Sequence, residues 1–247
     1  MSFDSEQRSG APSIVQCTTL GRWGRFGNQL LQYAFARAYA ERYGAVLEVP
    51  DWIGRRLFGL DDPYPSRELP RCELDVIPWG QVDVDLFGYF QKEECTAILS
   101  RAVLRRWFTI GEAWRGCVTL PERPYIAAHL RRGDYQTSGY CVVRESSYLR
   151  ACERFGLPAD RLVWVSEEAP RPGPEPALDF LADFLVLLEA DVILRANSTF
   201  SFWAGVLGRG RVFSPLVDGL VGWHDVEFVE GNWPRCVDCC DNLHIPE

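Results

Sequence analysis

The sequence predicts an α/β protein whose strands form parallel sheets. Short apolar runs that suit buried strands alternate with segments of helical periodicity along most of the 247 residues. This alternation is typical of parallel sheets with helices on their faces. With 47% hydrophobic and 24% charged residues, the composition is that of an ordered chain, long enough for one large domain or two small ones.

The first half of the chain opens with a predicted strand, helix and strand. Residues 13–20 (SIVQCTTL) form an apolar run, and residues 21–27 (GRWGRFG) form a loop punctuated by glycines. Residues 28–44 predict a helix, because apolar side chains recur at helical spacing up to a terminal glycine. Residues 45–49 (AVLEV) predict the second strand. Beyond it we expect loops with short helices at 51–81, a strand at 84–91 and a helix at 93–107.

The second half has a more regular pattern. Apolar runs predict strands at 125–130, 161–166, 191–195 and 211–214. Helical patterns lie between them at 146–155, 178–190 and 200–207. The halves join near residues 110–124, and we therefore expect two domains, residues 1–115 and residues 116–247.

Charge and hydropathy narrow the class of partner. The formal net charge is −8 and there is no run of positive charge, which argues against nucleic acid or an anionic membrane as the main partner. The N-terminus MSFDSEQRSGAPS lacks an apolar signal region, and no 18 consecutive residues are apolar. We therefore expect a soluble, cytoplasmic protein without a membrane segment.

The nine cysteines fit reduced thiols better than a disulfide framework, since their number is odd and they are scattered. Four side chains near the C-terminus are of the types that bind zinc: Cys236, Cys239, Cys240 and His244. No second pair of ligands supports a metal site there, so a frayed terminal segment is the other interpretation, and the sequence leaves both open.

Polar side chains follow three predicted strands of the second half. The segment PYIAAHLRRGDY ends in His129, Arg131, Arg132 and Asp134. The segment RLVWVSEEAP ends in Ser166, Glu167 and Glu168. The segment ADVILRANSTFSFW ends in Asn197, Ser198, Thr199 and Ser201, where the next helix begins. Because ligands of open parallel sheets bind outside the carboxyl ends of the strands, the three groups predict one site.

These residue types suit a nucleotide diphosphate. Arginine guanidiniums match phosphate oxygens as planar forks and keep their charge. A loop rich in Ser and Thr that opens a helix supplies hydroxyls, backbone N–H groups and the positive end of the helix dipole. Carboxylates suit ribose hydroxyls or the donor groups of a guanine edge.

Each group also has a simpler explanation. Arg132 would pair with Asp134 or a glutamate on a protein surface. Glu167 and Glu168 would be solvated loop charges, and Asn197 and Ser198 would be helix caps. The prediction of a site depends on the coincidence of all three groups.

Two other motifs support their usual functions weakly. Glycines 21, 24 and 27 have the spacing GxxGxxG rather than the GxGxxG of dinucleotide-binding folds, so they predict a tight turn and disfavour a nicotinamide oxidoreductase. The DVD sequence at 83–85 would suit a metal-dependent glycosyltransferase, but it lies outside the predicted site.

Four segments together resemble the α-1,2-fucosyltransferase family (glycosyltransferase family 11). These are GRFGNQLLQYAFARAYAERYG, LFGYFQKEEC, HLRRGDY and DFLVLLEADVILRANSTFSFWAGVL. HLRRGDY matches the HxRRxD motif that is also found in α-1,6- and protein O-fucosyltransferases. The segments occur in the family's order and span most of residues 20–210.

The resemblance implies a GT-B architecture, in which two Rossmann-like domains face each other across a cleft. It implies GDP-fucose as donor substrate, bound by the C-terminal domain, and no cofactor or metal. Donor-binding residues by this resemblance are His129, Arg131, Arg132, Glu167, Glu168, Asp183, Asn197, Ser198, Thr199 and Ser201. On the acceptor side of the cleft it places Gly27, Asn28 and Gln29.

The implied reaction is an inverting transfer of L-fucose to a glycan hydroxyl, the 2-hydroxyl of a galactosyl or similar residue. Arg131 is the expected main stabiliser of charge on the departing GDP, and Asp134 and Glu145 are both candidates for the general base. The chain departs from the family at Glu167–Glu168, where related enzymes often have two aspartates, and at Phe202, where Trp is usual. A different nucleotide-sugar donor, or a binding protein without catalysis, are the alternatives.

Overall fold

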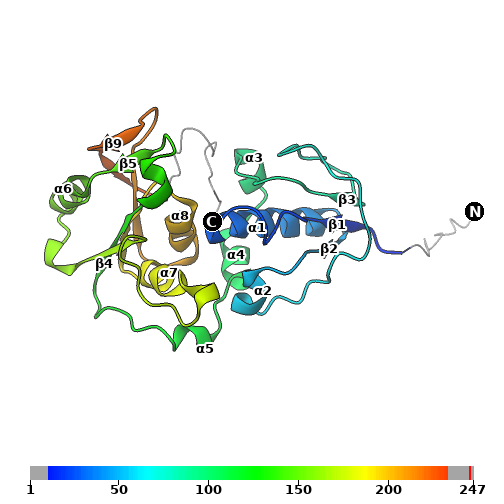
Figure 1. The fold of residues 1–247 in the computed structure, drawn as a ribbon, viewed down its shortest axis with the longest axis horizontal. Helices are drawn as coiled ribbons and strands as arrows, with labels where there is room; N and C mark the ends of the chain where they lie inside the picture. The colour runs from blue at the N-terminus through cyan, green and yellow to red at the C-terminus, as the bar shows by residue number, and fades with distance from the viewer. Residues whose placement is uncertain (1–10, 233–244, 246–247) are drawn as a thin grey trace, which may run out of the picture.

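The computed structural model describes residues 11–232 and 245 and confirms a mixed α/β fold with parallel sheets. One sheet is formed by the first half of the chain and one larger sheet by the second half, and Figure 1 shows them side by side. No helix of the described residues is long and apolar enough to cross a membrane. The boundary between residues 115 and 116 stays a prediction.

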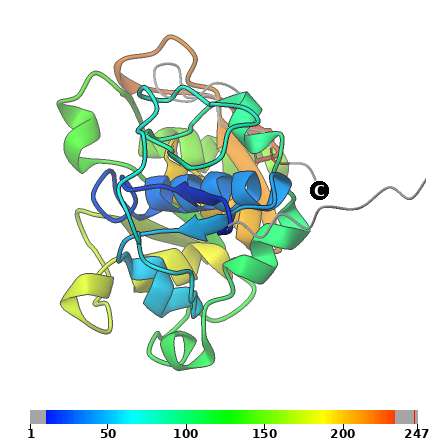
Figure 2. The same cartoon turned by 90° about the vertical axis from the view of Figure 1, so that its right-hand side faces the viewer.

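The sheet of the first half has three parallel strands in the order β2-β1-β3. They are β1 (Ile14–Gln16), β2 (Val46–Glu48) and β3 (Val84–Asp85). Helix α1 (Phe26–Arg42) follows β1 and begins two residues before the predicted start. Figure 2 shows β1 and α1 in blue, with the cyan segments on either side of them.

The predicted strand at 84–91 is wrong beyond Asp85. Phe90 has a φ of 55° and Gly88 a φ of 159°, so the chain leaves the extended conformation. The Asp75 carboxylate accepts hydrogen bonds from the N–H groups of Tyr89 and Phe90, at 2.7 and 2.9 Å. Hydrogen bonds to the Asp75 side chain therefore take the place of the strand pairing that was expected for residues 89 and 90.

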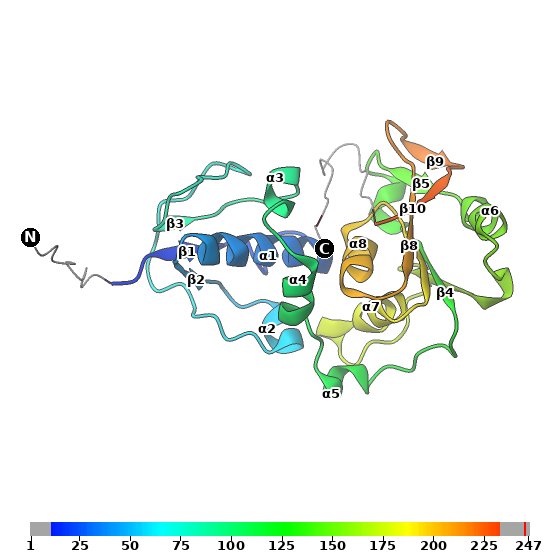
Figure 3. The same cartoon turned by 180° about the vertical axis from the view of Figure 1, so that it is seen from behind.

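Helix α2 (Ile53–Phe58) lies between β2 and β3 of the first half. Three further short helices, α3 (Glu93–Thr96), α4 (Arg101–Trp107) and α5 (Glu112–Arg115), lie between β3 and the second half. The predicted helix at 93–107 is thus two helices, because Ser100, which precedes α4, is extended with φ −130° and ψ 131°. The turn at 97–100 redirects α4 towards the second half, as Figure 3 shows.

The sheet of the second half has the order β10-β8-β7-β4-β6, with β10 antiparallel to β8 and the other pairs parallel. Its strands are β4 (Ile126–Leu130), β6 (Leu162–Ser166), β7 (Val192–Leu194), β8 (Arg211–Pro215) and β10 (Phe228–Glu230). The first four were predicted from the sequence. The helices are α6 (Glu145–Phe155), α7 (Leu181–Leu188) and α8 (Thr199–Leu207).

The remaining elements are short and were not predicted. Strands β5 (Cys141–Val143) and β9 (Gly222–His224) form a separate parallel pair. Three 3-10 helices are η1 (Gly133–Gln136), η2 (Ala159–Arg161) and η3 (Pro176–Leu178). Segments of three or four residues carry too little periodicity to be distinguished from loops.

One hydrophobic core extends through both halves, with α8 between α1 and the larger sheet (Figures 1 and 3). The Phe26 ring at the start of α1 stacks on Phe180 at 4.4 Å and meets Phe184 of α7 edge to face at 5.1 Å. Phe108 meets Trp203 of α8 edge to face at 5.3 Å. Such aromatic pairs stabilise a packed interface beyond the area that they bury, and this interface positions the two sheets.

Candidate functional site

A cavity of about 860 Å³ lies where the two halves meet. Its wall comes from six segments of the described chain that are distant in sequence: residues 24–28, Tyr89 with Gln91, parts of residues 129–140, Val165–Glu167, parts of residues 170–183 and parts of residues 195–202. Each of the four motifs singled out in the sequence contributes to this wall. They therefore form one site.

The topology of the larger sheet explains the position of the cavity. From β4 the chain adds β6 on one side and then crosses to add β7 and β8 on the other side. Connections that leave in opposite directions open a crevice at the carboxyl ends of β4 and β7. His129, at the end of β4, and Asn197, which follows β7, both line the cavity at this place.

Within the described part of the chain, Arg131 is one of three arginines that line the cavity, with Arg25 and Arg195. Its side chain is 13% exposed and donates to Glu167 Oε1 from Nη1 at 3.0 Å. Nη2 donates to Asp134 Oδ1, and the guanidinium lies over the Tyr135 ring at 4.8 Å. Its buried Nε has no hydrogen-bond partner among the described residues. Since buried polar groups are nearly always bonded, this N–H is a donor available to a ligand.

Glu167 and Asp134 hold Arg131 in place. Glu167 Oε1 also accepts from the backbone N–H of Arg132 at 3.0 Å, which fixes the carboxylate against the chain after β4. Asp134 Oδ2 pairs in addition with Arg25 of the other half at 3.3 Å. The two carboxylates thus fix the direction of the guanidinium, and an anionic ligand has to compete with them for it.

His129 is a neutral, buried side chain of the cavity wall. Burial first, and then the charges of Arg131 and Arg195, lower the pKa of the imidazole to about 3. The side chain is therefore uncharged at neutral pH. Its Nδ1 is buried and has no hydrogen-bond partner among the described residues, so a polar ligand atom would complete its hydrogen bonding.

Two helix N-termini meet at the cavity. A Cβ on Gly27, near the start of α1, would lie 2.7 Å from the carbonyl carbon of Thr199 and 2.8 Å from the nitrogen of Phe200, so only glycine permits this approach. Asn28 Oδ1 accepts from Thr199 Oγ1 and from Gln91 Nε2, both at 2.9 Å. Ser198 caps α8 by accepting from the N–H of Phe200 at 3.3 Å. The positive ends of both helix dipoles therefore lie beside the site.

The structure brings most of the predicted site residues to this cavity. The lining includes Gly27, Asn28, His129, Arg131, Asp134, Glu167, Asp183, Asn197, Ser198 and Thr199. Asp183 of α7 accepts from Arg171 Nη1 at 2.8 Å. Burial raises the pKa of Asp183 while the hydrogen bond and charge of Arg171 oppose that rise.

Arg132 lies elsewhere, contrary to expectation. Its side chain is directed away from the cavity and donates from Nη1 to the carbonyl of Val143 in β5 at 2.9 Å. It lies 4.8 Å from the centre of the Trp223 ring and 3.9 Å from Glu145 Oε1. Adjacent residues of an extended chain have side chains on opposite sides, and this explains why one arginine faces the cavity and the other supports β5.

Four further predicted residues are also absent from the lining. Glu145 is 63% exposed at the start of α6. Glu168 is exposed and accepts from Gln136 Nε2 at 2.7 Å. Ser201 is buried within α8 and donates to the carbonyl of Ala196 at 3.3 Å, and Gln29 donates to the carbonyl of Gly24 at 3.2 Å.

Other residues of the wall were not predicted. Arg195 is 1% exposed and donates to Asn232 Oδ1 at 3.0 Å. Tyr135 donates from its hydroxyl to the carbonyl of Asn197 at 2.9 Å and stacks on Tyr140. Arg195 is the last residue of the strand predicted at 191–195, and Tyr135 directly follows the RRGD sequence. Their positions near the strand ends were the signal that would have found them.

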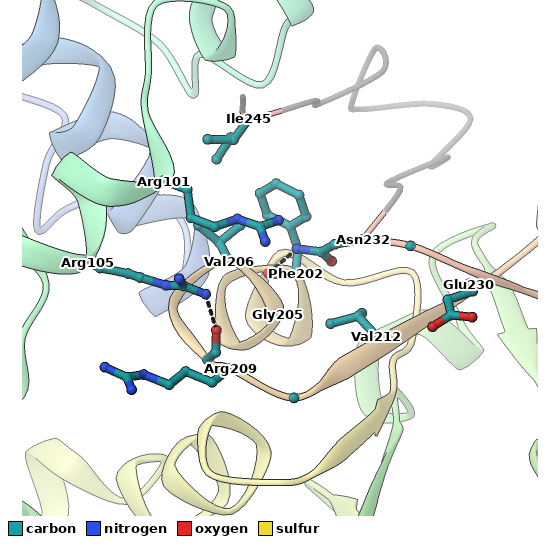
Figure 4. Close-up of a pocket in the computed structure, with 13 residues that line it drawn as sticks. Arg101, Arg105, Phe202, Gly205, Val206, Arg209, Val212, Glu230, Asn232 and Ile245 are labelled. Carbon is teal, nitrogen blue, oxygen red and sulfur yellow. Dashed lines mark hydrogen bonds between the residues drawn. The ribbon is translucent and has the colours of Figure 1, made fainter. Parts of the chain in front are cut away.

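A second cavity, of about 460 Å³, lies at the other end of α8 (Figure 4). Arg105 of α4 donates from Nε to the carbonyl of Leu207 at 3.2 Å and from Nη2 to that of Gly208. A cation bonded to the last carbonyls stabilises the C-terminal end of a helix. Ile245, 5% exposed, packs into the same cavity. These contacts support α8 from the end opposite to the candidate site.

The described residues contain no cluster of three or more side chains suited to a metal ion. Within DVD, Asp83 pairs with Arg67 at 2.6 Å and Asp85 pairs with Arg71 at 3.2 Å. These aspartates therefore neutralise arginines. The cysteine cluster at 236–244 lies outside the described residues.

The fold resembles that of known fucosyltransferase structures. A crystal structure of NodZ alpha-1,6-fucosyltransferase soaked with GDP-fucose matches with a TM-score of 0.52 and 16% identity, over 90% of this chain and 100% of that chain. Fucosyltransferase NodZ from Bradyrhizobium matches with a TM-score of 0.54 and 14% identity, over 90% and 100%. No family model and no curated protein matches the sequence. The likeness confirms the fold class, and the identity is too low to carry more.

Proposed function

We propose that the protein is an inverting glycosyltransferase that moves L-fucose from GDP-fucose to a hydroxyl of a glycan acceptor. The observation that carries the proposal is the convergence of four ordered fucosyltransferase-like motifs on one cavity that contains Arg131 and two helix N-termini. Structures of the same fold were obtained with GDP-fucose and with GDP. A cavity of about 860 Å³ is within the usual range for a ligand of nucleotide size.

In this reaction the acceptor oxygen bonds to the anomeric carbon of fucose as the bond from that carbon to the diphosphate oxygen breaks. Negative charge grows on the departing GDP. Arg131 would stabilise it through its available Nε–H and through nitrogens now bonded to Glu167 and Asp134. A group already fixed in direction needs little reorganisation in the transition state, and the N–H groups that begin α8 would bind the same phosphates.

The nucleoside end of the donor would lie against His129 and Asp183. Neutral His129 can accept or donate one hydrogen bond at Nδ1, depending on its tautomer. Asp183 is an acceptor oriented by Arg171. We propose that the site needs no metal, because fixed guanidinium and helix dipoles supply the positive charge that a cation would supply.

Asp134 remains the candidate general base, because Glu145 lies outside the cavity lining. Both oxygens of Asp134 are engaged by arginines, so it also holds Arg131 and Arg25. Asp134→Asn separates the two roles. Loss of a base lowers kcat and removes the acidic limb of the pH profile, whereas loss of an arginine partner lowers kcat at every pH and keeps that limb.

The linkage that we propose is α-1,2, to the 2-hydroxyl of a galactosyl or similar residue, from the resemblance of the motifs. The matched structures belong to an α-1,6-fucosyltransferase, so the linkage has to be read from the product. Incubation with GDP-fucose and lactose in EDTA, followed by NMR of the product, tests both parts. A fucosylated product with a 2-linked galactose supports the proposal, and hydrolysis or no reaction with a panel of neutral oligosaccharides contradicts it.

A further inference from the structure

Three aromatic side chains form a cluster to which the proposed donor site assigns no role. Trp23 meets Phe87 edge to face with ring centres 4.6 Å apart, and Trp23 lies 5.7 Å from Tyr89 at an angle of 34°. All three rings are partly exposed. We call Trp23, Phe87 and Tyr89 the aromatic platform. Large apolar rings that stay partly exposed on a fixed loop offer contact area to a ligand.

The platform lies at the carboxyl edge of the sheet of the first half. Trp23 belongs to the loop after β1, and Phe87 and Tyr89 follow β3, which is parallel to β1. This is the edge at which parallel sheets bind ligands. Tyr89 and Gly24, the residue after Trp23, both line the large cavity. The platform is therefore continuous with the proposed donor site.

The backbone beneath the platform is held by hydrogen bonds. The Asp75 carboxylate accepts from the N–H groups of Tyr89 and Phe90. Asp75 also donates from its own N–H to the carbonyl of Phe87 at 2.8 Å. Gln32 of α1 donates from Nε2 to the carbonyl of Trp23 at 3.2 Å. The rings are thus presented by an ordered backbone, which lowers the entropic cost of binding.

The polar groups around the platform suit an uncharged ligand. Arg71 lies 4.6 Å from the centre of the Phe87 ring, and its charge is paired with Asp85 at 3.2 Å. The Tyr89 hydroxyl has no hydrogen-bond partner among the described residues. A paired guanidinium and a free phenol offer hydrogen bonds without a net charge that would select an anion.

We propose that the aromatic platform binds a neutral pyranose ring of the acceptor, with the sugar's C–H face on the rings and its hydroxyls towards Tyr89 and Arg71. The negative face of an aromatic ring attracts polarised C–H groups. Tyr89 borders the cavity, so a sugar on the platform lies beside the proposed donor site. This inference rests on the proposed function for the identity of the reaction, but not for the binding of the sugar.

Fluorine NMR of protein labelled with 5-fluorotryptophan tests the binding directly. The Trp23 signal is assigned with Trp23→Phe, and lactose or diacetylchitobiose is added in the presence of GDP. The Trp23 signal should shift saturably in the millimolar range. Trp79 and Trp223, which are 41% and 44% exposed on other surfaces, are internal controls and should not shift. An unmoved Trp23 signal, or equal shifts of all three, overturns the proposal.

Kinetics separates a failure of the platform from a failure of the proposed function. Phe87→Leu removes an aromatic contact and Tyr89→Phe removes a hydrogen-bonding hydroxyl. Each should raise the acceptor KM by roughly three- to tenfold and leave GDP affinity unchanged. Tyr64→Phe is a matched control, since Tyr64 is 60% exposed and also lies next to an arginine, Arg55. Unchanged acceptor KM in both variants with intact GDP binding rejects the platform alone. Absence of GDP binding in the wild type rejects the donor assignment, and the NMR titration still decides whether the platform binds sugar.

Discussion

The two edges that meet at the large cavity differ in chemistry. The edge of the second half carries Arg131, the neutral imidazole of His129 and the N-terminus of α8. The edge of the first half carries the aromatic platform and the amides of Asn28 and Gln91. The second edge combines a largely buried arginine with a neutral imidazole, whereas the first edge presents rings and amides beside Arg25 and the start of α1. The proposal of an anionic donor on one edge and a neutral acceptor on the other rests on this difference.

The two edges are joined by direct contacts. Gly27 permits α1 to approach α8, and Asn28 accepts hydrogen bonds from Thr199 and Gln91. Arg25 adds an ion pair with Asp134. The amide of Asn28 thus links α1 to two other segments, and a small number of side chains joins the two edges.

The largest effect is expected from removing the charge of Arg131 on the second edge. Arg131→Ala should lower kcat by about 10²- to 10³-fold, the scale of one preorganised donor to a developing charge. Fucose transfer from GDP-fucose is the measurement, with circular dichroism to confirm folding. Arg161→Ala is the control, because Arg161 is exposed at the opposite, amino end of β6. Turnover near the wild-type value in Arg131→Ala would contradict the assignment of the second edge as the one that stabilises the charge of the donor.

The next largest effect is expected from a substitution that pushes α1 and α8 apart where the two edges meet. Gly27→Ala places a Cβ 2.7 Å from the Thr199 backbone and should cost about 1–3 kcal/mol of unfolding free energy. It should also weaken GDP binding, because α1 and α8 move apart at the cavity. Urea denaturation measures the first quantity. Gly116→Ala is the control, since its nearest backbone atom lies at an ordinary 3.4 Å. Equal stability of both variants would show that the close approach is unimportant.

His129 makes the second edge sensitive to acid. Its pKa is about 3 in the folded protein, against an ordinary value of 6.5. Between these values the unfolded chain binds the proton and the folded chain does not, so stability falls as the pH falls. The contribution is at most about 1.4 kcal/mol for each pH unit. His129→Gln should flatten the dependence measured by urea denaturation. A parallel dependence in wild type and His129→Gln would contradict a buried neutral imidazole.

The smallest expected effect concerns the ion pair between the edges. The side chains of Arg25 and Asp134 are 66% and 44% exposed, so Arg25→Ala should lower the unfolding free energy by less than about 1 kcal/mol. The loss should diminish with added salt, since exposed charges are screened. Denaturation at low and high salt measures it. A loss as large as that of Gly27→Ala would mean that this pair holds the halves together.

Local patterns predicted most of the framework of the second half. Strands β4, β6, β7 and β8 and the helices between them agree with the predictions. Buried parallel strands give short apolar runs, and the helices give longer apolar segments at helical spacing. The strand expected at 84–91 failed because Asp75 binds the backbone of Tyr89 and Phe90 across the loop. A side chain that acts over this distance in sequence leaves no periodic signal.

The sequence predicted which strand ends carry the residues of the candidate site. It did not predict in which direction each of their side chains points. Arg131 faces the cavity and Arg132 faces Val143, although both follow the same strand. The sequence does not show which of two adjacent residues points inward, because alternation places their side chains on opposite sides without fixing which side is the cavity. The rings of Trp23 and Tyr89 were missed because aromatic residues in a loop are as typical of a core as of a ligand site.

Calorimetric titration with GDP, UDP, GDP-fucose and GDP-mannose in EDTA tests the central claim most directly, that the charged edge binds the diphosphate of a guanosine donor. The account predicts metal-free binding of GDP and GDP-fucose, loss of that binding in Arg131→Ala and retention in Arg161→Ala. A preference for UDP, or no nucleotide binding by the wild type, would contradict it.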